Sequence, residues 1–220
     1  MCLIIVKPFG VNMLPEIFDV IKGASTTNRD GFGFASKTLT SNHIYIDKGY
    51  MDVDKIIDRL KLLKYNEDDE LVIHLRARTD GKISPQNCHP FVVSDNENIL
   101  NTLEGMTKLP VLAHNGMINI KTIGDYSDTW TWVKTVFSNP NINKAFLDSG
   151  KDYDARVVQK WFPHGKLAIL SPESEVQLIG SWQEKNGVYY SNSGYSYYVK
   201  HSKKSTVEQS YNCAYDGYCN

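Results

Sequence analysis

The sequence lacks both a long apolar run and a strong charge bias. A membrane-spanning helix needs about 20 consecutive apolar residues, and no stretch of this 220-residue chain is that long. The net charge of −1 gives no electrostatic reason to expect nucleic acid or an anionic membrane surface as a partner. The opening MCLIIVKPFG has no basic flank before its apolar residues and no small-residue cleavage site after them, so it does not fit a signal peptide. We expect a cytoplasmic protein without a membrane partner.

Cysteine is scarce, and its spacing fits neither a disulfide framework nor a zinc site. The four cysteines are Cys2, Cys88, Cys213 and Cys219. No pair has CxxC spacing, and the six histidines do not cluster with them, so a metal centre is not expected. In a reducing compartment these cysteines remain thiols. A glycine-rich phosphate loop is also missing, and we expect no cofactor.

Length and composition predict one globular domain. Hydrophobic residues make up 41% of the chain and charged residues 22%, which is ordinary for a soluble protein. A chain of 220 residues is long enough for one substantial core. We place the domain at residues 1–199. Residues 200–220 are polar and poorly periodic, and they form either a loosely ordered tail or a docking segment.

Strand-like and helix-like segments alternate along the chain without an internal repeat. Short apolar or β-branched runs predict strands at 2–6, 32–35, 43–46, 71–76, 111–115, 167–170, 176–179 and 188–192. Helical periodicity is present at 14–21, 53–63 and 127–137, with Asp52 and Ser127 as expected N-caps. Two more short helices are expected within 141–162. Because regular βαβ alternation is missing, we expect an α+β sheet sandwich rather than a doubly wound fold.

Two of the predicted strands carry polar side chains that fit either chemistry or structure. In LVIHLR, a period of two places His74 and Arg76 on one face and Ile73 and Leu75 on the other. In VLAHNG, His114 lies just before a glycine turn. Taken singly, the two histidines fit core residues with satisfied hydrogen bonds, and Arg76 fits a solvated strand charge.

The residue after the initiator methionine is a candidate nucleophile. Initiator methionine is generally removed when the second residue is small, and removal of Met1 would leave Cys2 with a free α-amine. Such an amine has a pKa of roughly 7.7 to 8.0, against about 8.5 for a thiol. It can therefore act as the general base for the thiol of its own residue, directly or through a water molecule. The simpler interpretation is a small apolar residue that opens a strand.

An ordered set of motifs resembles the class II glutamine amidotransferase domain, a family of N-terminal-nucleophile hydrolases. The set consists of MCLI at the start, NRDGFG at 28–33, HLRARTDGKISPQNCHPF at 74–91, LAHNGMI at 112–118 and YSDTW at 126–130. SWQEKNGVYYSN at 181–192 is similar to the closing strands of the family. The resemblance spans residues 1 to about 195. It implies a four-layer αββα sandwich of two mostly antiparallel sheets.

The resemblance also implies a reaction. Cys2 would attack the side-chain amide of L-glutamine, form a thioester and release ammonia and glutamate. The oxyanion of the tetrahedral intermediate needs fixed hydrogen-bond donors. At the matching positions these are the Asn115 side-chain amide and the Gly116 backbone N–H. A glycine there lets the backbone approach the reacting carbon closely.

Further positions match residues that hold free glutamine in the family. Arg76 matches the arginine that binds the α-carboxylate, and its planar fork suits a bidentate contact. Asp128 matches the acid that binds the α-ammonium, although an acid at a helix N-terminus is also favoured by the helix dipole. Thr79 and Gly81 match positions of the substrate loop. The candidates for supporting roles behind these contacts are Arg29, Asp30, His74 and His114.

The family usually couples the glutaminase to a synthetase or transferase, so an ammonia-accepting subunit is the implied partner. Two alternatives stay open. One is another N-terminal-cysteine hydrolase, an acylase that acts on a cyclic or acyl amide. Such substrates do not need the pair of Arg76 and Asp128. The other is a non-catalytic binding protein that keeps the scaffold.

Overall fold

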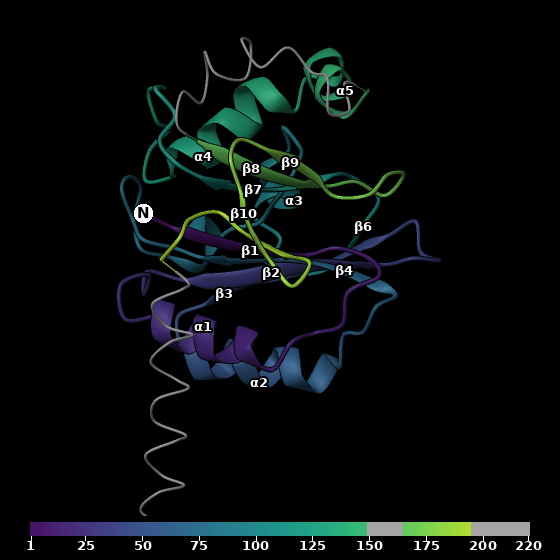
Figure 1. Cartoon of the computed structure of the whole chain (residues 1–220). Coiled ribbons are helices and arrows are strands. Elements are labelled where there is room, and N and C mark those ends of the chain that lie inside the picture. The colour runs from purple at the N-terminus through teal and green to yellow at the C-terminus, as the bar shows by residue number, and fades with distance from the viewer. Residues whose placement is uncertain (149–164, 195–220) are drawn as a thin grey trace, which may run out of the picture.

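The computed structural model describes residues 1–148 and 165–194, and these residues form four layers in the order helix, sheet, sheet, helix (Figure 1). Two short helices were predicted within 141–162, and the part of that segment from 149 onward lies outside the described residues, as does the predicted tail at 200–220. Cys213 and Cys219 therefore lie outside them as well. The sequence prediction of an α+β sandwich of two antiparallel sheets is confirmed.

The larger sheet has seven antiparallel strands within the described part of the chain. Their order across the sheet is β10 (Gln183–Lys185), β11 (Val188–Tyr190), β1 (Leu3–Lys7), β4 (Asp69–Leu75), β2 (Phe32–Thr38), β3 (Ile44–Tyr50) and β6 (Glu104–Thr107). β1 and β4 lie at the centre, and every residue of both is buried. Burial on both faces explains why β1 and the middle of β4 carry consecutive apolar residues, LIIV and LVI, rather than alternating ones.

The smaller sheet consists, among the described residues, of β5 (Phe91–Val92), β7 (Val111–Asn115), β8 (Lys166–Leu170) and β9 (Gln177–Ile179), in that order. The predicted strands at 111–115, 167–170 and 176–179 are thus confirmed within a residue at each end. β5 and β6 have no counterpart in the prediction. β5 has two residues, and β6 has the sequence EGMT without apolar alternation.

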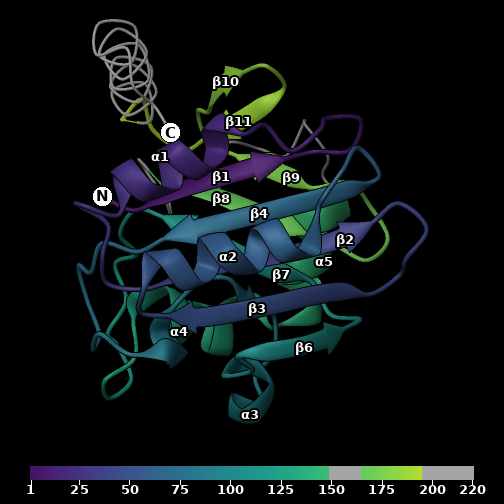
Figure 2. The same cartoon turned by 90° about the horizontal axis from the view of Figure 1, so that it is seen from below.

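Helices cover the outer face of each sheet. α1 (Glu16–Ala24) and α2 (Val53–Leu63) lie side by side against the larger sheet, as seen from below in Figure 2. On the other side lie α4 (Asp128–Trp132), the π-helical turn η2 (Val133–Phe137) and α5 (Pro140–Asp148). α3 (Glu97–Leu100) and a short 3₁₀ turn, η1 (Pro85–Asn87), fall in the connections. No helix within the described residues is long and apolar enough to cross a membrane.

Both predicted N-caps are present. The Asp52 side chain accepts a hydrogen bond from Asp54 N at 2.9 Å, and Ser127 Oγ accepts one from Trp130 N at 3.2 Å. These contacts satisfy N–H groups that the first helical turn leaves without an intrahelical partner. Ser127 therefore fixes the point at which the chain enters α4, with Asp128 as the first helical residue.

Three clusters of buried apolar side chains fill the three spaces between the layers. One joins α1 and α2 to the larger sheet, a second lies between the sheets, and a third joins the smaller sheet to α4 and η2. The second cluster includes Ile4, Val72 and Ala113 from β1, β4 and β7. These contacts hold the two sheets against each other.

The strand register brings distant segments to one end of the sandwich. In the antiparallel pairing of β1 with β4, Leu3 lies opposite Leu75, and Phe32 at the start of β2 also lies opposite Leu75. The residue before β1, the residue after β4 and the loop before β2 therefore meet. These are Cys2, Arg76 and the 28–31 turn. β7 ends at Asn115, and a hydrogen bond joins that side chain to Ser191, which directly follows β11.

Candidate active site

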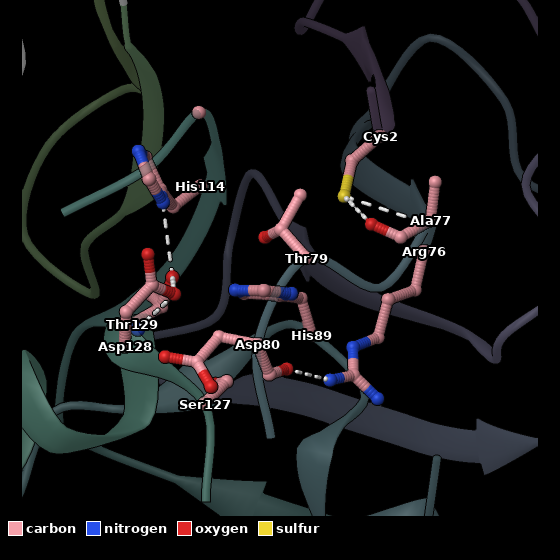
Figure 3. Close-up of a pocket in the computed structure, with 11 residues that line it drawn as sticks. Cys2, Arg76, Ala77, Thr79, Asp80, His89, His114, Ser127, Asp128 and Thr129 are labelled. Atoms are coloured by element: carbon pink, nitrogen blue, oxygen red, sulfur yellow. Dashed lines mark hydrogen bonds between the residues drawn. The ribbon is translucent and has the colours of Figure 1, made fainter. Parts of the chain in front are cut away.

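A small polar cavity of about 20 Å³ opens where these strand ends meet. Figure 3 shows Cys2 and Arg76 on one side of it and Asp128 and Thr129 on the other. The volume is enough for a water molecule or two. Thr79 and Asp80 from the segment after β4 form part of its wall.

Cys2 presents its thiol to this cavity from the start of β1. Its Sγ donates to Ala77 O and accepts from Ala77 N, both at 3.4 Å, and its own carbonyl accepts from Asn192 Nδ2 at 2.9 Å. Burial raises the pKa of the Cys2 thiol, although the hydrogen bond from Ala77 N works in the other direction. The thiol is therefore protonated at neutral pH and needs a base before it can act as a nucleophile.

Arg76 is buried beside the thiol, with 2% of its surface exposed. Its Nη1 donates to Lys82 O and its Nη2 to Asp80 O, each at 2.8 Å. Burial lowers the pKa of the guanidinium, but arginine remains charged in proteins. Two carbonyls of the 77–82 segment thus occupy two of its five N–H donors.

Asp128 faces the cavity from the first turn of α4 and is 7% exposed. Its Oδ2 accepts from Ile118 N at 2.7 Å, and its Oδ1 accepts from Thr129 N at 2.6 Å. Burial raises the pKa of this carboxyl, and the two backbone hydrogen bonds oppose that rise. The described residues contain no ion pair that joins Asp128 or Arg76 to an opposite charge. Burying such charges is costly unless something compensates them.

Asn115 and Gly116 lie next to Cys2 at the end of β7, and all three line a second, larger cavity. Gly116 has φ +153°, and a Cβ there would lie 2.9 Å from both Gly165 Cα and His114 Nε2. Only glycine therefore fits this position. Asn115 is 3% exposed, and its Nδ2 donates to Ser191 Oγ at 2.9 Å. Within the described chain, Asn115 Oδ1 is buried without a hydrogen-bond partner.

Two residues after β11 hold this end of the sandwich, and the sequence reasoning gave neither a role. Ser191 is fully buried, and its Oγ also accepts from Ile4 N at 2.9 Å. Its own N–H donates to Ile4 O at 3.0 Å, so it continues the ladder between β11 and β1. Asn192 fixes the Cys2 carbonyl. The only signal in the sequence was the motif that ends in VYYSN. Its last two residues are polar, but nothing in the motif reveals that their partners lie up to about 190 positions away.

Three buried histidines lie behind the cavity. His74 Nε2 and His114 O are 3.1 Å apart, His114 Nδ1 and Thr129 Oγ1 are 2.9 Å apart, and the rings of His74 and His89 are 4.1 Å apart. Burial lowers the pKa of His74 and of His114 to about 3, and that of His89 well below its ordinary value. All three are therefore neutral at physiological pH. His89 and His114 both line the cavity, although in the sequence His89 belonged only to the longer motif at 74–91.

The remaining predicted residues lie at different distances from the cavity. Thr79 lines it. Gly81 has φ +70° and packs against the backbone of Tyr126 and Ser127, where a Cβ would lie 2.7 Å from Ser127 N. Asp30 accepts from Arg78 N at 2.8 Å and so braces the segment after β4. Arg29 is exposed and is not part of the wall of either cavity in the described structure.

The second cavity has a volume of about 300 Å³ and also has Cys2 in its wall. Its wall contains Met1, Ala77 and Met117, together with Gly165, and it shares Cys2, Ala77, Thr79 and Gly116 with the polar cavity. The described residues contain no group of three or more histidine, cysteine or acidic side chains that could hold a metal ion.

The four layers and the strand topology define the αββα sandwich of the N-terminal-nucleophile hydrolases. One similar solved structure is glutamine phosphoribosylpyrophosphate amidotransferase from B. subtilis in complex with ADP and GMP. The TM-score is 0.51 at 17% sequence identity, and the likeness covers 91% of this chain but 44% of that chain. This chain therefore spans less than half the length of that enzyme. No family model matches the sequence, and no curated protein matches it. The likeness confirms the predicted fold.

Proposed function

We propose that this chain hydrolyses the side-chain amide of L-glutamine, with Cys2 as an N-terminal nucleophile. The observation that carries the proposal is that one cavity is lined by a thiol, a buried cation and a buried anion. Free glutamine has an amide at one end and a carboxylate and an ammonium at the other. Arg76 would bind the carboxylate and Asp128 the ammonium, so that each buried charge gains an opposite charge.

The reaction begins after Met1 has been removed and the α-amine of Cys2 is free. The amine takes the proton from Sγ, and the thiolate attacks the amide carbon. Asn115 Nδ2 and Gly116 N–H donate to the oxyanion. The C–N bond then breaks, the amine returns its proton to the leaving nitrogen, and ammonia departs. Water hydrolyses the thioester to glutamate and restores the thiol.

Glutamine is larger than a cavity of about 20 Å³, and in this proposal its binding moves the segment between Arg76 and Lys82. The contacts of Arg76 suggest how this happens. Its hydrogen bonds to Asp80 O and Lys82 O hold the segment in place, and an incoming carboxylate would compete for the same N–H groups. A carboxylate is the stronger acceptor. Thr79 and Gly81 would move with this segment.

The ammonia released would supply a synthetase or transferase, the partner that the predicted family relationship implies. The similar structure is an amidotransferase by name, which supports this class of partner without identifying one. A cytoplasmic location stays a prediction.

The test is covalent labelling combined with an ammonia assay. The protein is first checked by mass for loss of Met1, and then treated with a diazoketone analogue of glutamine. We expect one adduct, on Cys2, and loss of ammonia release in step with labelling. Cys2→Ala should bind no label and release no ammonia, whereas Cys88→Ala serves as the matched control and should behave as wild type. Labelling at Cys88, or full activity of Cys2→Ala, would refute the proposal.

A further inference from the structure

His89 is a buried polar residue in the wall of the polar cavity. It is 4% exposed, and within the described residues neither of its ring nitrogens has a hydrogen-bond partner. The ring packs against His74 and Phe91, with ring centroids 4.1 Å and 4.6 Å away. Buried polar groups nearly always have hydrogen-bond partners, because burial without one is costly. An exception in the wall of a cavity therefore points to a ligand as the missing partner.

The His89 ring can offer a hydrogen-bond acceptor to the cavity. Burial lowers the pKa of His89 well below its ordinary value, and its neighbours, first among them His74, lower it further. The ring is therefore neutral, with one N–H donor and one nitrogen that accepts. Figure 3 shows one ring nitrogen pointing toward the side of the cavity where Asp128 and Thr129 lie. In the tautomer that carries its proton on the other nitrogen, this nitrogen is the acceptor.

Asp128 alone cannot accept every hydrogen bond of an ammonium group. A carboxylate has about four acceptor positions, and an ammonium has three N–H donors. Oδ2 of Asp128 accepts from Ile118 N at 2.7 Å, and Oδ1 accepts from Thr129 N at 2.6 Å and from Thr129 Oγ1 at 3.2 Å. About one position remains for the three donors, so a bound ammonium needs a second acceptor. The carboxylate end has no such shortage, because the described chain uses only two of the five N–H donors of Arg76.

We propose that His89 is a further substrate-binding residue, and that its ring accepts a hydrogen bond from the α-ammonium of glutamine. This proposal rests on the proposed function, because the ammonium is that of the substrate bound by Arg76 and Asp128. Asp80 also lines the cavity, but it is exposed, and its Oδ1 accepts from Gly81 N at 2.7 Å. An exposed carboxylate keeps its hydrogen bonds to water, whereas the buried ring gains a partner that the described chain does not supply.

The expected signature is a loss of activity that depends on the α-ammonium. Ammonia release is measured on the full chain, after loss of Met1 has been checked by mass, with three substrates. These are L-glutamine, glutaramate, which is glutamine without its α-ammonium, and γ-aminobutyramide, which is glutamine without its α-carboxylate. His89→Phe keeps a buried ring without nitrogen. In this variant kcat/KM should fall about 10- to 100-fold for glutamine and γ-aminobutyramide, the usual effect of a hydrogen bond to a charged group, and less than about threefold for glutaramate. His89→Gln has an amide oxygen that can accept, and it should restore glutamine to within about fivefold of wild type.

A matched control separates the hydrogen bond from the packing of the ring. Phe91 is fully buried and contacts the His89 ring, but it is not among the residues that line the cavity in the described structure. Phe91→Leu therefore loosens the packing around His89 without removing a ring nitrogen. The ratio of kcat/KM for glutamine to that for glutaramate should stay at the wild-type value in this control. All variants are compared at a temperature at which circular dichroism shows them to be folded.

A second measurement observes the ring directly and does not depend on turnover. Cys2→Ala cannot form the thioester, so it should bind substrate without consuming it. In this variant, labelled with ¹⁵N at histidine, the His89 signals are those that disappear when His89→Gln is added. We expect the resonance of one His89 ring nitrogen to shift on addition of glutamine or γ-aminobutyramide, and to stay in place on addition of glutaramate.

The outcomes separate this proposal from the proposed function. Equal losses for glutamine and glutaramate in His89→Phe, or an equal fall of their ratio in Phe91→Leu, would show a packing role and overturn the proposal. A His89 resonance that shifts with glutaramate but not with γ-aminobutyramide would place the ring at the carboxylate and overturn it as well. In each of these cases, labelling of Cys2 by the diazoketone leaves the proposed function standing. Absence of glutamine turnover, together with absence of label on Cys2, would overturn both.

Discussion

Ser191 contacts, in the described structure, the side chain that we assign to the oxyanion, at 2.9 Å from Asn115 Nδ2. The nitrogen and oxygen of an amide exchange positions by a half-turn, so hydrogen-bond counting decides between the two orientations. With Nδ2 toward Ser191, the Asn115 Oδ1 is left buried without a partner in the described chain. After a half-turn, the Ser191 hydroxyl would donate to Oδ1 and still accept from Ile4 N. That orientation satisfies the oxygen and frees the NH₂ group for the reacting carbonyl.

The perturbation that tests this is Ser191→Ala. It removes the hydroxyl that distinguishes the two amide orientations, and such a hydrogen bond to a buried group is worth about 1–3 kcal/mol. Converted at about 1.4 kcal/mol per tenfold, the loss is about 5- to 150-fold in kcat. Removal of the donor itself, in Asn115→Ala, should cost about 10²- to 10³-fold. The Michaelis constant should change by less than about threefold in both variants, because the contact forms in the transition state.

The assay is steady-state ammonia release from glutamine, at a temperature at which every variant is folded by circular dichroism. Ser191→Ala also leaves Ile4 N without its acceptor, so some stability is lost as well. Ser36→Ala is the matched control: Ser36 is a buried serine of the same sheet, bonded to Tyr65 OH at 2.9 Å away from the site. It should lose stability without losing kcat.

The double variant decides whether Ser191 acts through Asn115. If it does, Ser191→Ala should cost less than about twofold when added to Asn115→Ala. Additive losses in the double variant, or a kcat of Ser191→Ala within twofold of wild type, would refute the reasoning. A fall in kcat of Ser36→Ala equal to that of Ser191→Ala would show that general loosening of the sheet is the cause.

Three further predictions follow from the buried charges. Arg76→Lys should lower kcat/KM for glutamine about 10- to 100-fold, because an ammonium cannot reproduce the guanidinium fork; activity within threefold of wild type would contradict the assignment. Asp128→Asn should abolish the preference for glutamine over its N-acetyl derivative, which has no α-ammonium, and a preserved preference in side-by-side assays would place the ammonium elsewhere. Burial lowers the pKa of Lys48 from 10.5 to about 7, so above pH 7 the unfolded chain binds more protons than the folded one and stability rises with pH. Between pH 7 and 9 the free energy of unfolding should rise by about 2 kcal/mol; urea unfolding measures this gain, and Lys48→Met should remove it. The rise ends near pH 9, because burial raises the pKa of the Cys88 thiol, and a raised thiol pKa makes stability fall as pH increases further. Equal pH slopes in wild type and Lys48→Met would contradict the pKa shift.

The sequence predicted those strands and helices in which the pattern of apolar residues directly reflects which side chains are buried. β1 and the middle of β4 carry apolar runs buried on both faces, and α2 has an apolar stripe with Asp52 before it. β6 could not be predicted, because EGMT is a partly exposed edge strand whose pairing with β3 is a tertiary event. Lys48 was equally hidden. It is a buried lysine over the ring of Phe91, and nothing in an alternating strand pattern identifies it.

The candidate site likewise has a part that the sequence predicted and a part that only the structure shows. The motifs pointed to Cys2, Arg76 and Asp128, and the structure brings these three to one cavity. The motifs could not predict the surroundings that set the pKa and the orientation of the side chains in the candidate site. The Ser191 contacts depend on a register between strands from opposite ends of the chain.

The burial and the hydrogen bonds around Cys2 also limit which group can accept the proton of its thiol. Burial raises the pKa of Cys2, so a proton acceptor is required. His114 and His89 line the cavity, but burial lowers the pKa of His114 to about 3 and that of His89 well below its ordinary value, and an imidazole with such a lowered pKa is a poor proton acceptor near pH 7. Both oxygens of Asp128 already accept backbone hydrogen bonds. Among the described groups around the thiol, the α-amine that removal of Met1 would expose is then the base whose pKa is best matched to neutral pH.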